Sequence, residues 1–486
     1  MRICGKLFLV RIALFLLIAV VGLLLVPSVS TILTPRIDGD YSVFSIVGRG
    51  WLNGEVPYLK YFDHKGPLMM LIQVIGQSIE AGKWGIWILE ILFAVISFEL
   101  LYRIGVAVGA SRAGNIIAMV ISIIFYFAYI DGGNSVEEWS LPFELLPLLL
   151  VVKYLKGDIS RVRVPSLITG ICFGAVAMIR INNNCIICGL AVALLIIFII
   201  RRQYKELLQC ILFFFIGVCV SVLPFIIYFA YYKALDDLFF SCYIFPMLYK
   251  KYWYSALLKL NITYLSPCFI LPVIAWFYNS SKENKEIFIL AVSVSLITFL
   301  TFIDGADYYH YFTLVLPIIA LSLQLSFNFK VYQKTLIIIF LLLPLKLSYA
   351  HTINSIMINI NHDRFMEARG NDMKLKAGLI QLIPEQELDS IYCSGSFAIP
   401  SCLYHLGHLP AGKYFVIQGL YSNFGEPVIS NIYYDFKNVN PKWVISTDDI
   451  LENGILSDRR GFYREIPADS LPEIFVTTNH RVYIRK

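Results

Sequence analysis

One stretch near the amino terminus gathers acidic, basic and imidazole side chains between two apolar segments. The stretch, TPRIDGDYSVFSIVGRGWLNGEVPYLKYFDHKGPL, places Asp38 and Asp40 near its start and Asp63, His64 and Lys65 near its end. A carboxylate can take a proton from a hydroxyl or an amine, and a lysine ammonium can hold an anion. These residue types therefore suit chemistry that removes a proton and stabilises negative charge. Solvation of a surface loop is the alternative explanation for the same charges.

Polar residues also interrupt three later apolar stretches. These are DGGNSVEEWSLPFELL with Glu137 and Glu138, GICFGAVAMIRINN with Arg180, and GADYYHYFTLVLP with His310 and Tyr311. Charge within an apolar segment is costly and usually functional, although Arg180 could instead extend to a membrane interface. Three more acids in apolar segments predict polar contacts between helices or interfacial positions: Glu90, Glu99 and Glu144.

The composition is that of an integral membrane protein. Of 486 residues, 58% are hydrophobic and 15% charged, against about 25% charged in ordinary soluble proteins. Apolar runs long enough to span a bilayer recur as far as residue 350, which predicts a transmembrane domain over residues 1–350 with about eleven helices. One large soluble enzyme is excluded, and nothing indicates nucleic-acid binding.

The distribution of Lys and Arg predicts the orientation. If the apolar segment 66–79, about 14 residues long, does not cross the membrane, five basic loops fall on the cytoplasmic side, as the positive-inside rule requires. This segment is therefore expected to be an interfacial or re-entrant helix. The amino terminus is then cytoplasmic, and the loop 30–66 and the carboxyl-terminal part are extracytoplasmic. We expect a bacterial inner membrane protein.

The carboxyl-terminal residues 351–486 predict a small soluble α/β domain. The apolar runs SIYCSG, KYFVIQG, KWVISTD, EIFVTT and RVYIR have strand character, and residues 398–406 have helical character. The sequence of this domain does not indicate its function. Cys393 and Cys402 lie in it, and either a disulfide or two free thiols would suit an extracytoplasmic domain.

The first stretch resembles the first loop of polyprenyl-phosphate-sugar-dependent glycosyltransferases of the GT-C superfamily, family 39. It is most similar to the group of protein O-mannosyltransferases and aminoarabinose transferases. Their pattern is an Asp that begins a helix at the membrane surface, then G-x-x-P-Y, then an aromatic residue, an acid and a Lys before Pro-Leu. The matching positions are Asp40, Gly54, Pro57, Tyr58, Phe62, Asp63, Lys65, Pro67 and Leu68. The Asp-Glu pair of the protein mannosyltransferases is Asp40-Tyr41 here, which puts a protein acceptor in doubt.

The resemblance implies transfer of a sugar from a polyprenyl-phosphate donor to a surface glycan, a lipid or another acceptor, by a single inverting displacement. Asp40 would be the general base, with Asp38 as the competitor for that role. The expected ligands of the donor phosphate are Lys65, Arg180 and His64. The residues expected to support the acceptor, the sugar or a metal are Glu137, Glu138, Asp63, His310 and Tyr311. A divalent cation shared by Glu137 and Asp40 is one option for the role of that glutamate.

Two other functions compete with this interpretation. An O-antigen polymerase or ligase would be expected to carry its largest loop late in the series of spans, with Arg and His in it. A transporter or flippase for lipid-linked glycans would be expected to show broken helices and charges near the bilayer midplane, often in two similar halves. The early position of the charged cluster favours the transferase over the polymerase, and the sequence shows neither pattern expected of the transporter.

Overall fold

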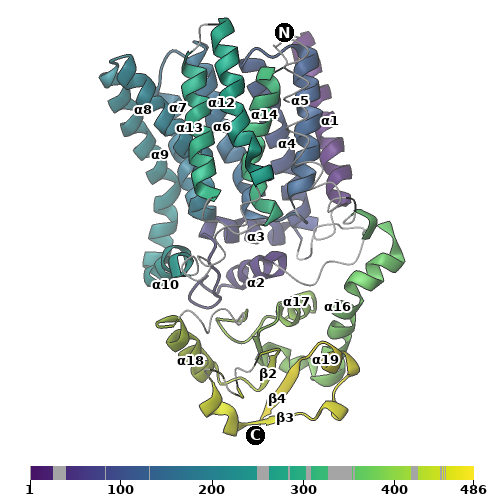
Figure 1. Ribbon diagram of the computed structural model, residues 1–486. Coiled ribbons are helices and arrows are strands. Elements are labelled where there is room, and N and C mark those ends of the chain that lie inside the picture. The colour runs from purple at the N-terminus through teal and green to yellow at the C-terminus, as the bar shows by residue number, and fades with distance from the viewer. Residues whose placement is uncertain are drawn as a thin grey trace. The chain divides into compact units, whose positions relative to one another are not determined.

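The computed structural model describes residues 2–25, 40–80, 82, 84–130, 132–248, 262–282, 285–302, 308–326, 353, 356–358, 360–416, 425–448, 451–452, 454 and 456–486. The chain forms two compact units, each assembled from separate segments (Figure 1). The helical unit comprises Met1–Val29, Trp87–Tyr228 and Ser255–Ile356. The mixed unit comprises Ser30–Ile86, Phe229–Tyr254 and Met357–Lys486.

The helical unit is a bundle of long apolar helices. Six helical stretches among the described residues are long and apolar enough to cross a membrane. Residues 335–350, at the end of the predicted transmembrane domain, lie outside the described residues. The elements are α1 (Arg2–Leu24), α4 (Trp84–Ala107), α5 (Arg112–Tyr129), α6 (Val136–Leu155), α7 (Arg163–Arg180), η1 (Ile181–Asn184), α8 (Cys185–Ile200), α9 (Tyr204–Tyr231), α12 (Ile262–Lys282), α13 (Lys285–Phe302), η4 (Tyr309–Val315) and α14 (Leu316–Ser326).

Local sequence explains where several of these helices begin and end. The Oγ atom of Ser111 accepts a hydrogen bond from the amide of Gly114 and caps α5, and Ser135 caps α6 in the same way. The expected break between α7 and α8 is confirmed, because the polar run from Ile181 to Asn184 forms the short 3-10 turn η1. Helix α7 therefore ends at Arg180, and α8 begins at Cys185.

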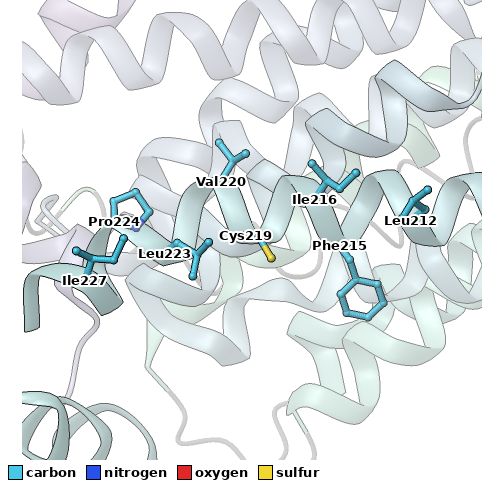
Figure 2. A pocket seen from close by; sticks show the side chains of 8 residues that line it. All are labelled: Leu212, Phe215, Ile216, Cys219, Val220, Leu223, Pro224 and Ile227. Atoms are coloured by element: carbon cyan, nitrogen blue, oxygen red, sulfur yellow. The ribbon is translucent and has the colours of Figure 1, made fainter. Parts of the chain in front are cut away.

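Small residues bring α7 and α9 into close contact. A Cβ atom added to Gly217 would lie 2.2 Å from the carbonyl oxygen of Leu167, and one added to Gly170 would lie 2.0 Å from that of Phe214. Backbone approach through small residues is a common way for membrane helices to associate. The outer face of α9 carries a shallow apolar hollow (Figure 2). Its lining residues are Leu212, Phe215, Ile216, Cys219, Val220, Leu223, Pro224 and Ile227.

Two short helices form the first part of the mixed unit. Helix α2 (Asp40–Leu52) begins at Asp40, as expected from the resemblance to a loop whose Asp begins a helix. Helix α3 (Pro67–Ile79) has 13 residues, so its length is about 20 Å, less than the roughly 30 Å of a hydrocarbon core. Its placement at the membrane surface stays a prediction. The two helices pack closely, because a Cβ atom on Gly48 would lie 2.4 Å from Cβ of Gln73.

The rest of the mixed unit contains a four-stranded sheet with the order β1-β2-β4-β3. Strand β1 pairs with β2 in parallel, and β4 is antiparallel to both β2 and β3. The elements are α10 (Leu235–Phe239), η2 (Phe240–Ile244), α16 (His362–Leu382), η5 (Glu385–Ser390), β1 (Ile391–Ser394), α17 (Ala398–His405), α18 (Val428–Val439), β2 (Trp443–Ser446), η7 (Ser457–Phe462), β3 (Tyr463–Glu465), η8 (Ala468–Ser470), α19 (Glu473–Thr477) and β4 (Arg481–Arg485).

The sheet confirms the small α/β domain and corrects two of its expected strands. Three of the apolar runs form β1, β2 and β4, but EIFVTT forms helix α19. Pro472 precedes this helix, and Ile474 and Phe475 pack against Gly378 of α16. In the run KYFVIQG, residues 413–416 are not strand, and residues 417–419 lie outside the described residues.

Alternate side chains of the strands build two cores, one on each face of the sheet. Ile391, Cys393 and Ile445 belong to the core formed with α16, α17 and α19. Tyr392 and Val444 belong to the second core, which also contains Phe62 and Phe245 from the earlier segments of the mixed unit. Cys393 and Cys402 are both buried as free thiols in the first core. The boundary near residue 350 stays our proposal for the end of the transmembrane part.

Candidate active site

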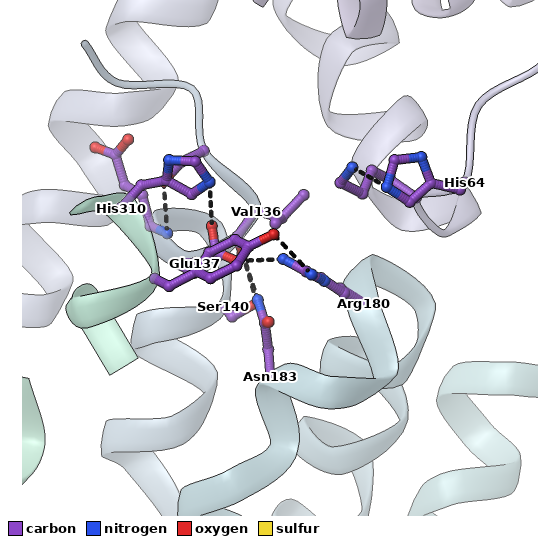
Figure 3. A network of polar contacts seen from close by, with 11 residues as sticks. His64, Val136, Glu137, Ser140, Arg180, Asn183 and His310 are labelled. Atoms are coloured by element: carbon purple, nitrogen blue, oxygen red, sulfur yellow. Dashed lines mark hydrogen bonds and ion pairs between the residues drawn. The ribbon is translucent and has the colours of Figure 1, made fainter. Parts of the chain in front are cut away.

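Four of the expected site residues meet in the helical unit, and we call them the arginine cluster (Figure 3). Nη1 of Arg180 donates to Oε1 of Glu137 at 2.8 Å, and Nη2 donates to the hydroxyl of Tyr311 at 3.0 Å. The guanidinium also lies over the ring of Tyr311, 4.6 Å from its centroid. Nε2 of His310 is 4.0 Å from Oε2 of Glu137. Three segments separated by many residues in the sequence therefore converge on one carboxylate.

The ends of three elements position this cluster. Glu137 lies in the first turn of α6, Arg180 is the last residue of α7, and Tyr311 lies in η4. A cation at the carboxyl end of a helix and an anion at the amino end both interact favourably with the helix dipoles. Asn183 joins the two helices, because its Nδ2 donates to the carbonyl of Val136 at 3.1 Å and to Oγ of Ser140 at 3.0 Å.

Burial strengthens the ion pair between Glu137 and Arg180. Both side chains still have polar atoms that can bind a ligand. The side chain of Glu137 is fully buried, whereas that of Arg180 is 22% exposed. A guanidinium has five N–H donors, and the contacts with Glu137 and Tyr311 use two of them. Oε2 of Glu137 is buried and makes no hydrogen bond, and Nε2 of His310 lies 4.0 Å from it. The cluster can therefore hold a further anion on Arg180 and a donor group on Glu137.

Glu138 points to a different set of partners from its neighbour Glu137. The hydroxyl of Tyr126 donates to Oε1 of Glu138 at 2.6 Å. Its carboxyl group also interacts with that of Glu90, which accepts a hydrogen bond from the amide of Asn134. Of the two adjacent acids, Glu137 alone contacts Arg180 in the described contacts.

A second group of expected site residues lies in the mixed unit, and we call Asp40, Asp63, His64 and Lys65 the loop cluster. The amide of Lys65 donates to Oδ1 of Asp63 at 2.7 Å. Nζ of Lys65 lies 2.6 Å from Nε2 of His64 and 5.6 Å from the ring centroid of Phe44. Asp63 and Lys65 are each only 6% exposed. The loop thus holds a cation next to an imidazole and a buried acid.

The backbone of Lys65 is fixed from two sides. The hydroxyl of Tyr58 donates to the carbonyl of Lys65 at 2.6 Å, and Sγ of Cys242 approaches the same oxygen at 3.4 Å. Tyr58 has a φ of 65°, an uncommon conformation for a bulky side chain. Burial raises the pKa of the Tyr58 hydroxyl well above its ordinary value, so it stays a donor. The position of the lysine is therefore set by its neighbours before any ligand arrives.

Burial also changes the acidity of Asp63. Loss of solvent raises the pKa of its carboxyl group to about 6, and the charge of Asp40 adds to this rise. The charge of Lys65 and the amide hydrogen bond oppose the rise without cancelling it. Asp40 is exposed at the amino end of α2, and Asp38 lies outside the described residues. Of the two acids described, Asp40 is the one that an acceptor can reach from solvent, because Asp63 is buried.

Among the described residues, no group of three or more His, Cys, Asp or Glu side chains is arranged to hold a metal ion. The cation that Asp40 and Glu137 were expected to share therefore stays a prediction. Asn183 and Cys242 support the arginine cluster and the loop cluster, and Glu90 interacts with Glu138; none of the three was assigned to the site from the sequence. The sequence marks Glu90 as unusual, because it is an acid within an apolar segment. It does not distinguish Cys242 from any other small buried residue.

Comparisons with known proteins agree on the fold. No protein-family model matches the sequence, and no curated protein matches it significantly. The chain is similar to the crystal structure of ArnT from Cupriavidus metallidurans in the apo state, with a TM-score of 0.59 over 99% of this chain and 98% of that chain. It is also similar to ArnT bound to undecaprenyl phosphate, with a TM-score of 0.57 over 97% of each chain. The chain has the fold of these ArnT structures.

The identity to both ArnT structures is 11%, so this likeness establishes the architecture and not the residue roles. It confirms a polytopic helical membrane protein with a small α/β domain. It covers nearly the whole of both chains, including the carboxyl-terminal domain. The roles of individual residues follow from the geometry of the two clusters and stay proposals.

Proposed function

We propose that this protein is a membrane glycosyltransferase that moves a sugar from a polyprenyl-phosphate donor to an acceptor on the extracytoplasmic face. The observation that carries the proposal is the likeness to ArnT over almost the full length of both chains. One of those structures holds undecaprenyl phosphate, a lipid phosphate of the proposed donor class. The acceptor is a surface glycan or a lipid.

The loop cluster supplies the base in this proposal. Asp40 takes the proton of the acceptor hydroxyl or amine as that atom bonds to the anomeric carbon of the sugar. The bond from this carbon to the phosphate oxygen breaks, the configuration inverts, and the lipid phosphate leaves with the bonding electrons. Asp40 suits this role because it is exposed and lies at the start of a fixed helix. Asp63 is buried and hydrogen bonded, so its role is to orient Lys65.

Lys65 and Arg180 supply the positive charge that the departing phosphate needs. Arg180 can donate to two phosphate oxygens while it keeps its contact with Glu137, and Lys65 acts as a point charge. His64 accepts from Lys65 and can donate through its other ring nitrogen. Glu137, Tyr311 and His310 orient the guanidinium and the substrate beside it. Preorganised positive charge of this kind stabilises the transition state for loss of the phosphate.

Binding of undecaprenyl phosphate to the purified full-length protein tests the donor side. Lys65→Ala and Arg180→Ala should each weaken binding by roughly 10-fold to 100-fold, since a hydrogen bond to a charged group contributes about 1.5–3 kcal/mol. Lys60→Ala is the matched control, because Lys60 lies in the same loop outside the cluster. Native mass spectrometry over a lipid titration gives the affinities. Unchanged affinity in both cluster variants, or no binding by the wild type, would contradict the donor assignment.

Substitution of the two amino-terminal acids tests the base. Asp40→Asn should lower transfer by a factor of roughly 10² to 10⁴, the usual contribution of a general base, without weakening donor binding. Asp38→Asn should retain transfer. Incorporation of sugar into the acceptor is the measurement, at matched protein levels. The reverse result, with Asp38→Asn inactive and Asp40→Asn active, would assign the base to Asp38.

A further inference from the structure

The carboxyl-terminal domain contacts the loop cluster through the residue that precedes it. Phe62 is 5% exposed and belongs to the second core of the sheet, together with Tyr392, Tyr414 and Val444. Its ring centroid lies 5.0 Å from that of Tyr414. Its amide donates to the carbonyl of Lys413 at 2.9 Å. A side chain from the first loop is thus part of the interior of a domain that begins about 300 residues later.

The same contact is reinforced on both sides of Phe62. The ring of Tyr61 packs edge-on against Phe415, with 5.9 Å between centroids. Phe245, from the middle segment of the mixed unit, lies 4.9 Å from Phe62 and 6.0 Å from His64, again between ring centroids. Aromatic rings at these distances and angles attract one another beyond simple burial. Phe62, which three segments of the mixed unit hold in place, is therefore the residue directly before Asp63 of the loop cluster.

One ion pair fixes the backbone segment that accepts a hydrogen bond from the amide of Phe62. Nζ of Lys413 lies 2.5 Å from Oδ1 of Asp237 in α10, and both side chains are largely shielded from solvent. The amides of Lys413 and Tyr414 donate to the carboxylate of Asp435 in α18. Lys413 thus fixes the backbone segment whose carbonyl accepts the hydrogen bond from Phe62.

A second attachment holds the helices on either side of the loop. The guanidinium of Arg49, in α2, lies 4.0 Å from the ring centroid of Tyr404 and donates to its carbonyl at 3.0 Å. The hydroxyl of Tyr404 donates to Oε1 of Gln77, in α3, at 3.2 Å. Helix α17 of the carboxyl-terminal domain therefore contacts both α2 and α3, and Asp40 lies at the start of α2.

We propose that the carboxyl-terminal domain is the scaffold of the loop cluster, and that Phe62 and Lys413 are positioning residues for Asp63, His64 and Lys65. The burial of Phe62 and the Lys413–Asp237 pair together fix the backbone that carries these three side chains. The domain therefore contributes to catalysis without touching the reacting atoms. This role in catalysis rests on the proposed function, whereas the anchoring itself does not.

Hydrogen–deuterium exchange of residues 58–66 in the purified full-length protein tests the anchoring. Lys413→Asp should place two acids together and speed exchange in this segment by roughly tenfold or more, since loss of tertiary contacts favours local opening. The double variant Lys413→Asp/Asp237→Lys should restore slow exchange because the ion pair is rebuilt. Lys442→Asp is the matched control, since Lys442 pairs with Glu387 at 2.5 Å in the same domain and has no contact with the loop among the described contacts.

A second pair of variants separates anchoring from general loss of stability. Phe62→Leu and Phe475→Leu each remove an aromatic ring from a core of the mixed unit. Only Phe62→Leu should speed exchange at residues 58–66. Unchanged exchange in both Lys413→Asp and Phe62→Leu would overturn the scaffold proposal, as would equal effects of the two leucine variants.

Sugar transfer measured on the same variants connects the anchoring to catalysis. We expect Lys413→Asp to lower kcat and the double variant to recover it, in parallel with exchange. Faster exchange with unchanged kcat would overturn the positioning role. If the wild type transfers no sugar, the proposed function fails, and the exchange data still decide whether the domain anchors the loop.

Discussion

The pairing of Glu137 with Arg180 joins a fully buried acid to a base that is only partly exposed. Loss of one partner leaves the other charge buried, which typically costs 3–5 kcal/mol, whereas removal of both charges avoids that penalty. We therefore expect Glu137→Ala to lower the free energy of unfolding by about 3 kcal/mol. Glu137→Gln/Arg180→Gln should lower it by much less. Thermal unfolding in detergent measures both.

A more exposed ion pair of the same unit serves as the control. Arg201 and Glu286 are 34% and 22% exposed and lie 2.5 Å apart. Solvent screens such a pair, so Glu286→Ala should cost no more than about 1 kcal/mol. Equal destabilisation by Glu286→Ala and Glu137→Ala, or a double variant as unstable as Glu137→Ala, would contradict the buried pairing.

The raised pKa of Asp63 predicts a pH dependence of stability. The folded protein holds this proton up to about pH 6, whereas an unfolded chain loses it near 4. The folded state therefore binds more protons in that window, and the contribution of Asp63 to stability falls as the pH rises from about 4 through 6. The contribution lost is up to about 3 kcal/mol.

Asp63→Asn tests this dependence because the amide oxygen still accepts from the amide of Lys65. Relative to the wild type, the variant should gain stability as the pH rises from 4 to 7. The shift in unfolding temperature at pH 4.5 and pH 7.5 gives the comparison. An identical shift at both pH values would exclude the buried, perturbed acid, and Asp469→Asn is the control because Asp469 is exposed.

For individual residues, the sequence indicated which residue types matter but not which side chains pair with each other. Arg180, His310 and Tyr311 were expected near the substrate because they interrupt apolar sequence or match a motif. Their contact with Glu137, rather than Glu138, depends on which side of α6 each acid faces. Two adjacent acids cannot be distinguished by type, so this choice required the packing of α4, α5 and α7 around α6.

Among the elements, α7 depends on close contact with α9 to keep its end in place. Gly217→Leu should force the two helices apart, because a Cβ atom at Gly217 would lie 2.2 Å from a backbone oxygen of α7. Overpacking of this kind costs about 1–3 kcal/mol, and the shift of α7 should also weaken donor binding through Arg180. Val220→Leu on the exposed face of α9 is the control. Equal unfolding temperatures for the two variants would contradict the close contact.

Helices were easier to predict than strands. The break at Ile181–Asn184 and the start of α2 at Asp40 follow from polar residues at fixed positions. The run EIFVTT has strand-like composition, but a preceding proline and burial of Ile474 and Phe475 against α16 favour a helix. Short apolar runs carry too little periodicity to decide between the two, so tertiary packing determined the outcome.

For the whole molecule, the sequence suggested a boundary in chain order, whereas the compact units combine distant segments. The change from apolar to mixed composition near residue 350 reports burial in lipid. It carries no information on contacts such as that of Phe62 with Tyr414, which joins positions about 350 residues apart. A phenylalanine in a loop gives no sign of which core it will enter.

We propose that this protein adds a sugar from a lipid phosphate, with Asp40 as the base. The most direct test is mass spectrometry of surface glycans and lipids from cells that produce the wild type or Asp40→Asn at equal levels. We predict that the mutant cells lack one sugar unit and accumulate its polyprenyl-phosphate donor. Identical glycan and lipid profiles would contradict the claim, and shortening of whole glycan chains would indicate a polymerase instead.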